Sequence, residues 1–294
     1  DEARAALEDA LRRAEAAGDR RLVATALGHL GIVRSAGGEL EAARDLFTRA
    51  LSEAEAGGDT AVLPVHLLNL AGVHEALHEP ALAIDLLRRA ETLARRLGRT
   101  GPLGAALLTL GNLYAGIGAD DEARAVLAEA RELSERTGVR AVAAQAALIT
   151  AELEARHAPQ RALRSANEAR TAFAEMGEPS RAAEARCVEG EIAFALADAA
   201  AAREALAQGR ESAPPGLAPR LDLLEAAILR ADGDAQGAMK LLDRAVAESE
   251  RAGLADLAAR GDAAAAELLD EVGSPLGGER RRRAAERLSA VALR

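Results

Sequence analysis

The sequence is poor in aromatic residues, cysteine and long apolar runs. Among 294 residues there are no tryptophans, one tyrosine and three phenylalanines, so a core must be built almost wholly from Ala, Leu and Val. A single cysteine excludes an internal disulfide and fits a reducing compartment, for which we expect a cytoplasmic location. We find no run of about 18 apolar residues that could cross a membrane, and no signal peptide.

The composition that remains favours an all-α protein. Ala, Leu, Glu and Arg are strong helix formers, and 49% of the residues are hydrophobic. The formal net charge of −10 argues against nucleic acid or an anionic membrane as a partner. The chain opens at Asp1 inside a predicted helix (DEARAALEDALRRAEAAGD), so we expect a fragment of a longer protein.

A pattern of small and large residues recurs every 40 residues. The segments GELEAARDLFTRAL, EPALAIDLLRRAET and DDEARAVLAEAREL align on three positions, which hold Ala43, Ala83 and Ala123, then Phe47, Leu87 and Leu127, then Ala50, Ala90 and Ala130. Preceding segments keep the same step with Leu30-Gly31, Leu70-Ala71 and Leu110-Gly111. Each unit is therefore predicted to be a helical hairpin that buries its apolar face by stacking on its neighbours.

The register extends along most of the chain. Later units follow at steps of 39, 40 and 36 residues, marked by Ala162, Ala202 and Ala238. We predict a repeat array over 1–253, with a half repeat at 1–18 and repeats at about 20–58, 60–98, 100–138, 139–177, 178–215 and 216–253. Residues 254–294 are predicted to form a degenerate terminal hairpin or capping helices.

These residues resemble the tetratricopeptide repeat family. Its small-residue signature is present as Leu30-Gly31 with Ala43, Phe47 and Ala50. The closing proline of the family is absent, and a longer second helix explains a period of 40 rather than about 34. The resemblance implies a right-handed α-solenoid, in a long variant similar to the sensor regions of large bacterial regulators.

The stretch HEALH, residues 74–78, matches the zinc-peptidase pattern of two imidazoles and a general base. In the repeat register, however, His78 falls in the turn between two helices, two residues before Pro80. The two imidazoles should then not share one helical face. We therefore predict no metal, no cofactor and no catalytic residue, with His74 as a half-buried packing residue.

Two other features have structural interpretations. Cys187 is predicted to be a small packing residue on a first helix, with a reactive thiol as the alternative. The basic run Arg280–Arg283 is predicted to be a solvated helix face or the entry to a following domain, since no aromatic residues accompany it. The carboxylates elsewhere are expected on outer helical faces beside arginines.

The family resemblance also implies a ligand-binding groove. In tetratricopeptide repeats the first helices line a concave face, and their inward positions contact the ligand. Those positions hold Thr25, Gly28, His29, Ile32, Val65, Leu68, Asn69, Gly72, Ala105, Leu108, Thr109 and Asn112. None of them is Lys or Arg, so this groove suits a helix or an apolar segment rather than an acidic tail.

Two classes of non-catalytic function stay open, and we predict the first of them, with the second as the alternative. One is a protein–protein interaction scaffold, a regulatory arm that binds a partner protein or another domain of its parent chain. The other is a sensor of a small molecule or peptide. A sensor should have a pronounced concave pocket with convergent polar groups, whereas a scaffold should have a long shallow groove. A zinc hydrolase is retained only as a hypothesis to be tested.

Overall fold

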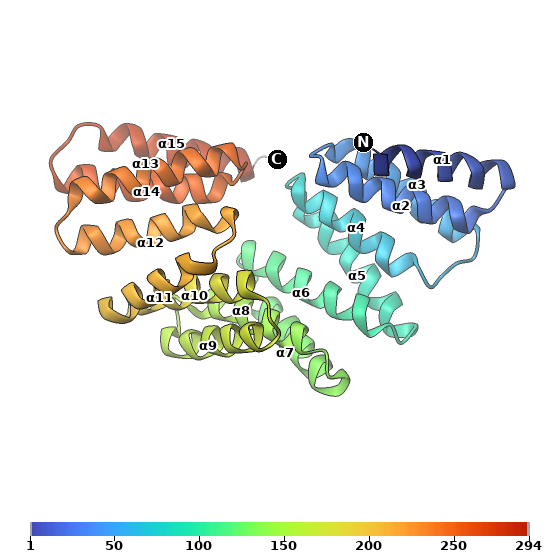
Figure 1. The fold of residues 1–294 in the computed structure, drawn as a ribbon, viewed down its shortest axis with the longest axis horizontal. Helices are drawn as coiled ribbons and strands as arrows, with labels where there is room; N and C mark the ends of the chain where they lie inside the picture. Colours follow the sequence, from blue (N-terminus) through green and yellow to red (C-terminus); the bar gives the residue numbers. More distant parts are fainter. Residues whose placement is uncertain (1, 293–294) are drawn as a thin grey trace. The chain divides into compact units, whose positions relative to one another are not determined.

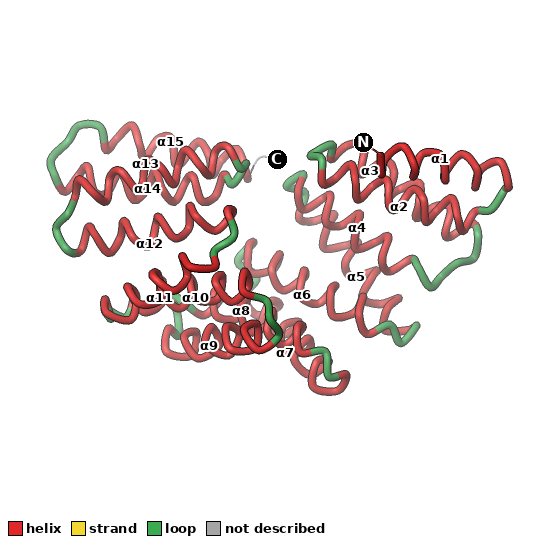
Figure 2. The backbone as a smooth tube through the Cα atoms, in the orientation of Figure 1, coloured by secondary structure: helices red, strands yellow, loops and turns green. Residues whose placement is uncertain are grey.

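The computed structural model describes residues 2–292, and these form α-helices joined by short turns. The chain divides into two compact units, one up to Val142 and one from Ala143 on. The first holds α1 (Glu2–Ala17), α2 (Arg20–Ala36), α3 (Leu40–Ala56), α4 (Leu63–Ala76), α5 (Pro80–Arg96), α6 (Thr100–Gly116) and α7 (Asp120–Thr137). Within residues 2–292 there is no strand, as Figure 2 shows by colour.

The second unit begins within α8 (Arg140–Glu154). It continues with α9 (Pro159–Glu175), α10 (Pro179–Ala195), α11 (Ala199–Ser212), the 3-10 helix η1 (Pro215–Leu217), α12 (Ala218–Ala231), α13 (Ala235–Arg251), α14 (Ala255–Glu271) and α15 (Gly277–Ala292). The predicted all-α helical-repeat fold is thereby confirmed. We call α2, α4, α6, α8, α10, α12 and α14 the first helices, and the odd-numbered helices the second helices.

Each first helix packs against the second helix that follows it. In the first unit the pairs α2–α3, α4–α5 and α6–α7 make the most extensive contacts, and each second helix also contacts the next first helix. Figure 1 shows these hairpins following one another in sequence order from α1 to α5. Neighbouring first helices touch as well, α2 with α4 and α4 with α6, so they share one face of the unit.

Small residues allow this close packing. Ala43, Ala83 and Ala123 are 0% exposed, each on the buried side of a second helix. Gly111 on α6 faces Leu127 on α7, and a Cβ added to Gly111 would lie 2.6 Å from the Leu127 Cδ2 atom. That separation is far inside van der Waals contact, so the register places glycine where two helices approach most closely.

The turns lie where the repeat register predicts them. The breaks between paired helices fall at 37–39, 77–79, 117–119 and 232–234. Most helices end at a glycine with positive φ, such as Gly38 at 76° and Gly118 at 75°, which closes the last turn without a Cβ clash. Two such positions hold other residues: His78 has φ 59° and Ala197 has φ 61°.

The second unit departs from the expected charged exterior. Asp222 on α12 and Asp262 on α14 are 1% and 0% exposed, so these carboxylates lie in the core rather than on an outer face. The predicted solvated face holds for Arg281, Arg282 and Arg283, which are exposed, but it is wrong for Arg280. Arg280 is not part of a solvated face, because its side chain binds Asp262 at 2.7 Å and also binds Asp243. Together with Arg287, which binds Asp262 at 2.9 Å, it fastens α15 to the unit.

Candidate functional site

The first-helix face of the first unit carries the predicted groove residues. Thr25, His29, Ile32, Val65 and Asn112 are exposed, whereas Leu68, Asn69, Leu108 and Thr109 are half-buried. All of them come from α2, α4 and α6, which contact one another in sequence order. Gly28 is an exception to the prediction: it is buried, and a Cβ there would lie 2.9 Å from the His66 Cε1 atom.

This face is hollowed between α2 and α4. A hollow of about 400 Å³ is lined by Ile32, Ser35 and Ala36 of α2 and by Leu68, Asn69 and Gly72 of α4, with Phe47 beneath. Two of the predicted polar residues are already engaged within their own helices. The Thr25 hydroxyl donates to the Arg21 carbonyl at 2.9 Å, and Thr109 donates to the Ala105 carbonyl at 3.0 Å.

Glu75, the acidic residue of HEALH, lies beside the predicted groove residue Asn112. The Asn112 side chain hydrogen-bonds to the Glu75 carboxylate. Burial raises the pKa of Glu75, and the hydrogen bond from Asn112 only partly opposes that effect. The carboxylate of the motif is therefore a half-buried group held against the next first helix.

The two histidines of HEALH do not form a metal site. Helix α4 ends at Ala76, and His78 lies in the following turn with positive φ. The His74 Nδ1 atom lies 2.5 Å from Glu79 Oε2, so that imidazole is engaged at the end of its own hairpin. Within residues 2–292 no group of three or more His, Cys, Asp or Glu side chains is arranged to hold a metal ion.

A larger hollow, of about 950 Å³, lies on the first-helix face of the second unit. Its apolar lining includes Val188, Ile192, Leu257 and Leu288, from α10, α14 and α15. Its charged lining includes Glu152 of α8, Glu191 of α10, Arg220 of α12 and Arg260 of α14. Polar side chains from four first helices thus converge beside an apolar surface, as in many ligand pockets.

Arg220 is the centre of this charged cluster. Its Nε and Nη2 atoms donate to the two oxygens of Glu191 at 3.0 and 2.6 Å, and Nη1 donates to Glu152 Oε1 at 2.6 Å. Arg260 adds a longer contact to Glu191 Oε1, at 3.4 Å. This bidentate arrangement holds the Arg220 guanidinium and the Glu191 carboxylate in one relative orientation, and it is among the stronger ion-pair geometries.

The electrostatics of the cluster favour its ionised form. Burial alone would raise the pKa of Glu191, but the hydrogen bonds and positive charge of Arg220 outweigh burial and lower that pKa. Burial would lower the pKa of Arg220, but the hydrogen bonds that it donates to Glu191 outweigh burial, so the pKa of Arg220 is raised. Both partners therefore stay charged across the physiological pH range.

The repeat register places all four charged residues at the predicted groove positions. Glu152 and Glu191 follow Asn112 at steps of 40 and 39, and Arg260 follows Arg220 at a step of 40. Arg220 itself occupies the position that Thr25 and Val65 hold in the first unit. The predicted groove covered the first three units only, so these four residues were not among the predicted ones. Continuing the same register would have found them.

Cys187 lies close to this cluster without belonging to the hollow. It is 0% exposed on α10, and burial raises the pKa of its thiol to about 12, with the nearby Glu191 carboxylate acting in the same direction. The prediction of a packing residue is confirmed, since a protonated buried thiol is a poor nucleophile.

None of the helices in residues 2–292 has the length and apolar character needed to span a bilayer.

One family model matches part of the chain. Residues 63–136 match the family model described as tetratricopeptide repeat. No curated protein sequence matches the chain.

Several solved structures share the fold. The apo form of RapI is 12% identical, with a TM-score of 0.77 over 92% of this chain and 99% of that one. The apo form of the quorum sensor NprR from B. thuringiensis is 13% identical, with a TM-score of 0.75 over 97% of this chain and 82% of that one. The Rap conjugation gene regulator of plasmid pLS20, in complex with the Phr* peptide, is 12% identical, with a TM-score of 0.72 over 92% and 75%. At these identities the likeness concerns the fold.

Proposed function

We propose that this tetratricopeptide repeat chain is a non-catalytic regulatory module that binds a peptide on its first-helix face. The proposal rests mainly on the hollow of about 950 Å³ in the second unit, where charged side chains from four first helices meet an apolar surface. A pocket of this kind is the feature expected of a sensor rather than of a shallow scaffold. Peptide binding would then regulate another protein or another domain of the parent chain.

The lining indicates the ligand's chemistry. Arg220 is saturated by two carboxylates, so it positions Glu152 and Glu191 rather than receiving a ligand itself. Arg260 has one long contact and is about half exposed, which leaves donors for a ligand carboxylate or backbone carbonyl. Ile192, Leu257 and Leu288 offer an apolar surface for one or two aliphatic side chains. A short peptide with a carboxylate at one end and an aliphatic side chain meets both requirements.

The structural relatives favour a peptide over a metabolite. The Rap regulator of pLS20 was solved in complex with the Phr* peptide, and NprR is described as a quorum sensor. These are properties of those proteins, and they support the same class of ligand for a chain of the same fold. A bacterial signalling role is proposed on the same ground.

The test is a selection of random peptides against the purified chain, followed by affinity measurement with the selected peptides. Arg260→Ala should weaken binding by about tenfold or more, because the guanidinium is the open donor of the hollow. Arg164→Ala, which removes an exposed arginine of α9 outside the hollow, is the matched control and should bind as the parent chain does. Equal binding by all three proteins would refute this site.

A second candidate, the interaction scaffold, is favoured by the hollow of about 400 Å³ between α2 and α4. Its apolar residues Ile32 and Leu68 suit a helix or extended segment of a partner protein. Selected peptides that lose binding with Leu68→Ala and not with Arg260→Ala would assign the ligand to this groove instead.

A further inference from the structure

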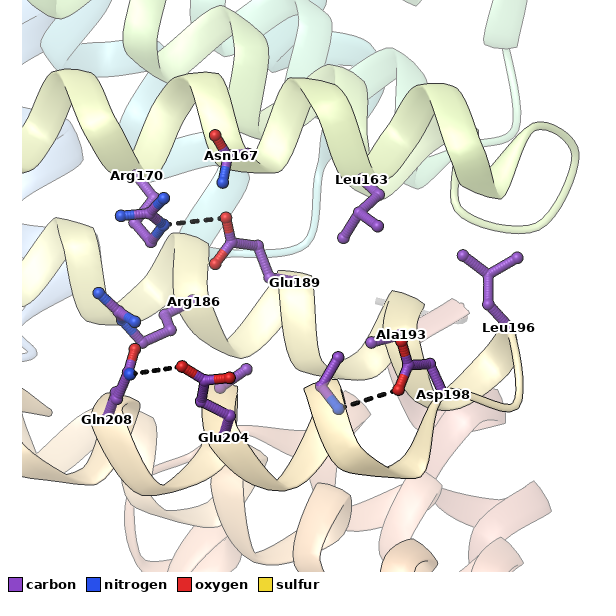
Figure 3. Close-up of a pocket in the computed structure, with 12 residues that line it drawn as sticks. Leu163, Asn167, Arg170, Arg186, Glu189, Ala193, Leu196, Asp198, Glu204 and Gln208 are labelled. Atoms are coloured by element: carbon purple, nitrogen blue, oxygen red, sulfur yellow. Dashed lines mark hydrogen bonds and ion pairs between the residues drawn. The ribbon is translucent and has the colours of Figure 1, made fainter.

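A separate groove runs along α10 on the opposite, second-helix side of the second unit. Hollows of about 620 and 560 Å³ lie end to end between α9 and α11, and both are lined by Arg186 and Gln208. Figure 3 shows the first of these hollows, with Arg186 and Gln208 at one end and Leu163, Ala193 and Leu196 toward the other. We call this the α9–α11 groove.

Arg186 is a half-buried cation without a counter-ion. It has no hydrogen bond or ion pair within residues 2–292, although most arginines of the chain have one. The carboxylates that line the same hollow have other partners. Glu189 accepts from Arg170 at 3.0 Å, Glu204 accepts from Gln208 at 3.0 Å, and Asp198 caps α11 by accepting from the Ala201 amide.

The repeat register shows what this position normally contains. Leu27, Leu67 and Leu107 occupy it in the first unit and are 0% exposed. Asp222 and Asp262 occupy it in the two repeats after Arg186, at steps of 36 and 40 residues. A position that is core in every other repeat therefore carries an arginine in this one, and its long side chain brings the guanidinium out into the groove.

The two aspartates show how the fold neutralises a charge at this position. Asp222 accepts from Arg210 of α11 at 2.7 Å and from Arg244 of α13 at 2.5 Å. Each aspartate is thus held by two arginines from second helices, since Arg280 and Arg287 hold Asp262. The residue of α11 that corresponds to Arg244 is Gln208, which is neutral. At Arg186 the charge is reversed. Glu211 of α11 also lines the second hollow, but it is exposed and forms no ion pair with Arg186.

The neighbouring second helices are also not tied together here. Ion pairs join them directly elsewhere, as Arg49–Glu15 for α3 and α1, Arg89–Glu55 for α5 and α3, Arg95–Glu129 for α5 and α7, and Arg287–Glu250 for α15 and α13. Asp222 links α11 and α13 through its two arginines. None of the charged residues that line the two hollows forms an ion pair between α9 and α11, so the groove stays open along α10.

We propose that the α9–α11 groove binds a helix of a partner protein, and that this helix presents a carboxylate to Arg186 and Gln208. A Glu or Asp of the partner neutralises Arg186. In the next repeat Arg210 and Arg244 neutralise Asp222 in the same way, with the signs of the charges reversed. An aliphatic residue of the same helix contacts Leu163, Ala193 and Leu196. Because Arg186 and Ala193 are seven residues apart on α10, about 10 Å, the acidic and aliphatic residues of the partner stand seven positions apart.

This partner surface is distinct from the proposed peptide site. The peptide hollow is lined by first helices and contains Arg260, whereas the α9–α11 groove is lined largely by second helices and contains Arg186. Both faces use α10, from opposite sides of the same helix. The two sites can therefore be tested independently.

The first test asks whether Arg186 lacks a partner within the chain. Arg186→Leu restores the residue type of the early repeats and should leave the melting temperature unchanged or raised. Asp222→Leu, at the same register position, should lower it, because Arg210 and Arg244 then lose their shared carboxylate. A melting temperature that falls as far in Arg186→Leu as in Asp222→Leu would show an internal counter-ion and overturn the proposal.

The second test uses capped 15-residue helical peptides built on Ala and Gln, each with one Glu and one Leu at spacings of 3, 4, 7 or 11. Binding is followed by NMR through the side-chain Nε–H signals of the arginines. The spacing of 7 should bind most tightly, and Glu→Gln in the peptide should weaken binding by about tenfold. Arg186→Gln in the protein should weaken binding by the same factor. Binding of the Glu→Gln peptide to the Arg186→Gln protein should be little weaker than with either change alone.

Charge reversal completes this test. Arg186→Glu should bind the peptide in which Glu is replaced by Lys better than it binds the original peptide. Arg260→Ala should bind all these peptides as the parent chain does, which separates this surface from the first-helix site. Failure of every peptide to bind, or equal binding by the parent chain and Arg186→Gln, would refute the partner surface and leave the proposed function untouched.

Discussion

His78 and Ala197 stand in turns of the kind where most other helices of residues 2–292 end on a glycine with positive φ. Ala197 has φ 61°, in the left-handed region where a Cβ crowds the following carbonyl oxygen. Ala197→Gly should therefore raise the free energy of unfolding, by about 0.5–1 kcal/mol after the entropy that glycine adds to the unfolded chain. Chemical denaturation with the midpoint and slope both fitted is the measurement.

Gly177 provides the reverse control. It ends α9 with φ 73°, and no atom lies within 4 Å of the position where a Cβ would be placed. Gly177→Ala therefore introduces backbone strain without a clash, and it should lower stability by a similar amount. If both substitutions moved stability in the same direction, the turn geometry would not be the cause.

His66 makes stability depend on pH. It is 6% exposed and its Nδ1 atom has no hydrogen-bond partner. Burial lowers the pKa of His66 below its ordinary value of 6.5; the nearby Asp59 carboxylate opposes this shift and His29 adds to it. The unfolded chain therefore binds a proton at higher pH than the folded one. This contribution to stability is fully present above pH 6.5 and is lost as the pH falls below that value.

His66→Gln should remove this dependence. The melting temperature of the parent chain should fall between pH 7 and pH 5 by more than that of the variant, because Gln has no charged form to bury. His157→Gln, which changes an exposed histidine of the second unit, should keep the full dependence. Parallel pH profiles in all three proteins would assign the effect to other groups.

At the scale of single residues, sequence predicted packing better than polar contacts. Ala43, Ala83 and Ala123 were predicted from their period, because a small residue at a helix crossing is required in every repeat. The pairing of Glu75 with Asn112 could not be predicted, because it joins two repeats across a face whose side-chain directions depend on the crossing angle.

At the scale of helices, the repeat register makes a direct prediction about packing. Ala123 is 0% exposed on α7, whereas Ala125 two residues later is exposed. Ala123→Leu should overpack the contact between α6 and α7 and cost about 1–3 kcal/mol of unfolding free energy. Ala125→Leu is the matched control on the same helix and should change stability by less than about 0.5 kcal/mol. Unchanged stability in Ala123→Leu would argue against this helix interface.

The docking of α15 depends on a buried carboxylate. Asp262 binds both Arg280 and Arg287, and these arginines also reach Asp243 and Glu250 on α13. Asp262→Asn should weaken this attachment by about 1.5–3 kcal/mol, the typical contribution of a charge-assisted hydrogen bond. Amide exchange in residues 277–292 should then become faster while that of α12 stays the same. Asp270→Asn, which removes only the exposed pair with Arg281, should leave the exchange of α15 nearly unchanged.

Sequence predicted the existence and ends of the helices well, and it misjudged α15. Turns and helix ends follow from glycine and from the apolar period, both of which are local. The role of Arg280 depends on a carboxylate 18 residues away that is itself buried, so a run of four arginines looked solvated. A charged residue in the sequence does not indicate whether its side chain is buried when its counter-ion lies on another helix.

At the scale of the whole chain, the two halves should differ in local stability. The early repeats keep a strict period with Phe or Leu at their central position, whereas the later ones have drifting steps and Ala-rich faces that bury less apolar area per residue. Amides in 22–135 should therefore exchange more slowly than those in 180–250, with Leu68, Leu108 and Asn112 in the protected part. Equal protection in both parts would contradict this prediction.

The candidate site illustrates the limit of sequence reasoning at this scale. The register identified which positions of the first helices face outward, and these are the positions where Glu152, Glu191, Arg220 and Arg260 occur. It did not indicate which repeats would hold a pocket. The hollow is also lined by Leu257 of α14 and Leu288 of α15, and no local pattern encodes how these two helices pack beside α10 and α12.

The buried state of Cys187 has a practical consequence for labelling. With its thiol fully buried and its pKa raised to about 12, the only cysteine of the chain should not react with maleimide dyes in the folded protein. A cysteine introduced at Ser35 or Ser212, which line the hollow between α2 and α4 and the α9–α11 groove, would then be the sole site of attachment. A fluorophore at each position would report occupancy of one surface at a time, without first removing the native thiol and disturbing the packing around it.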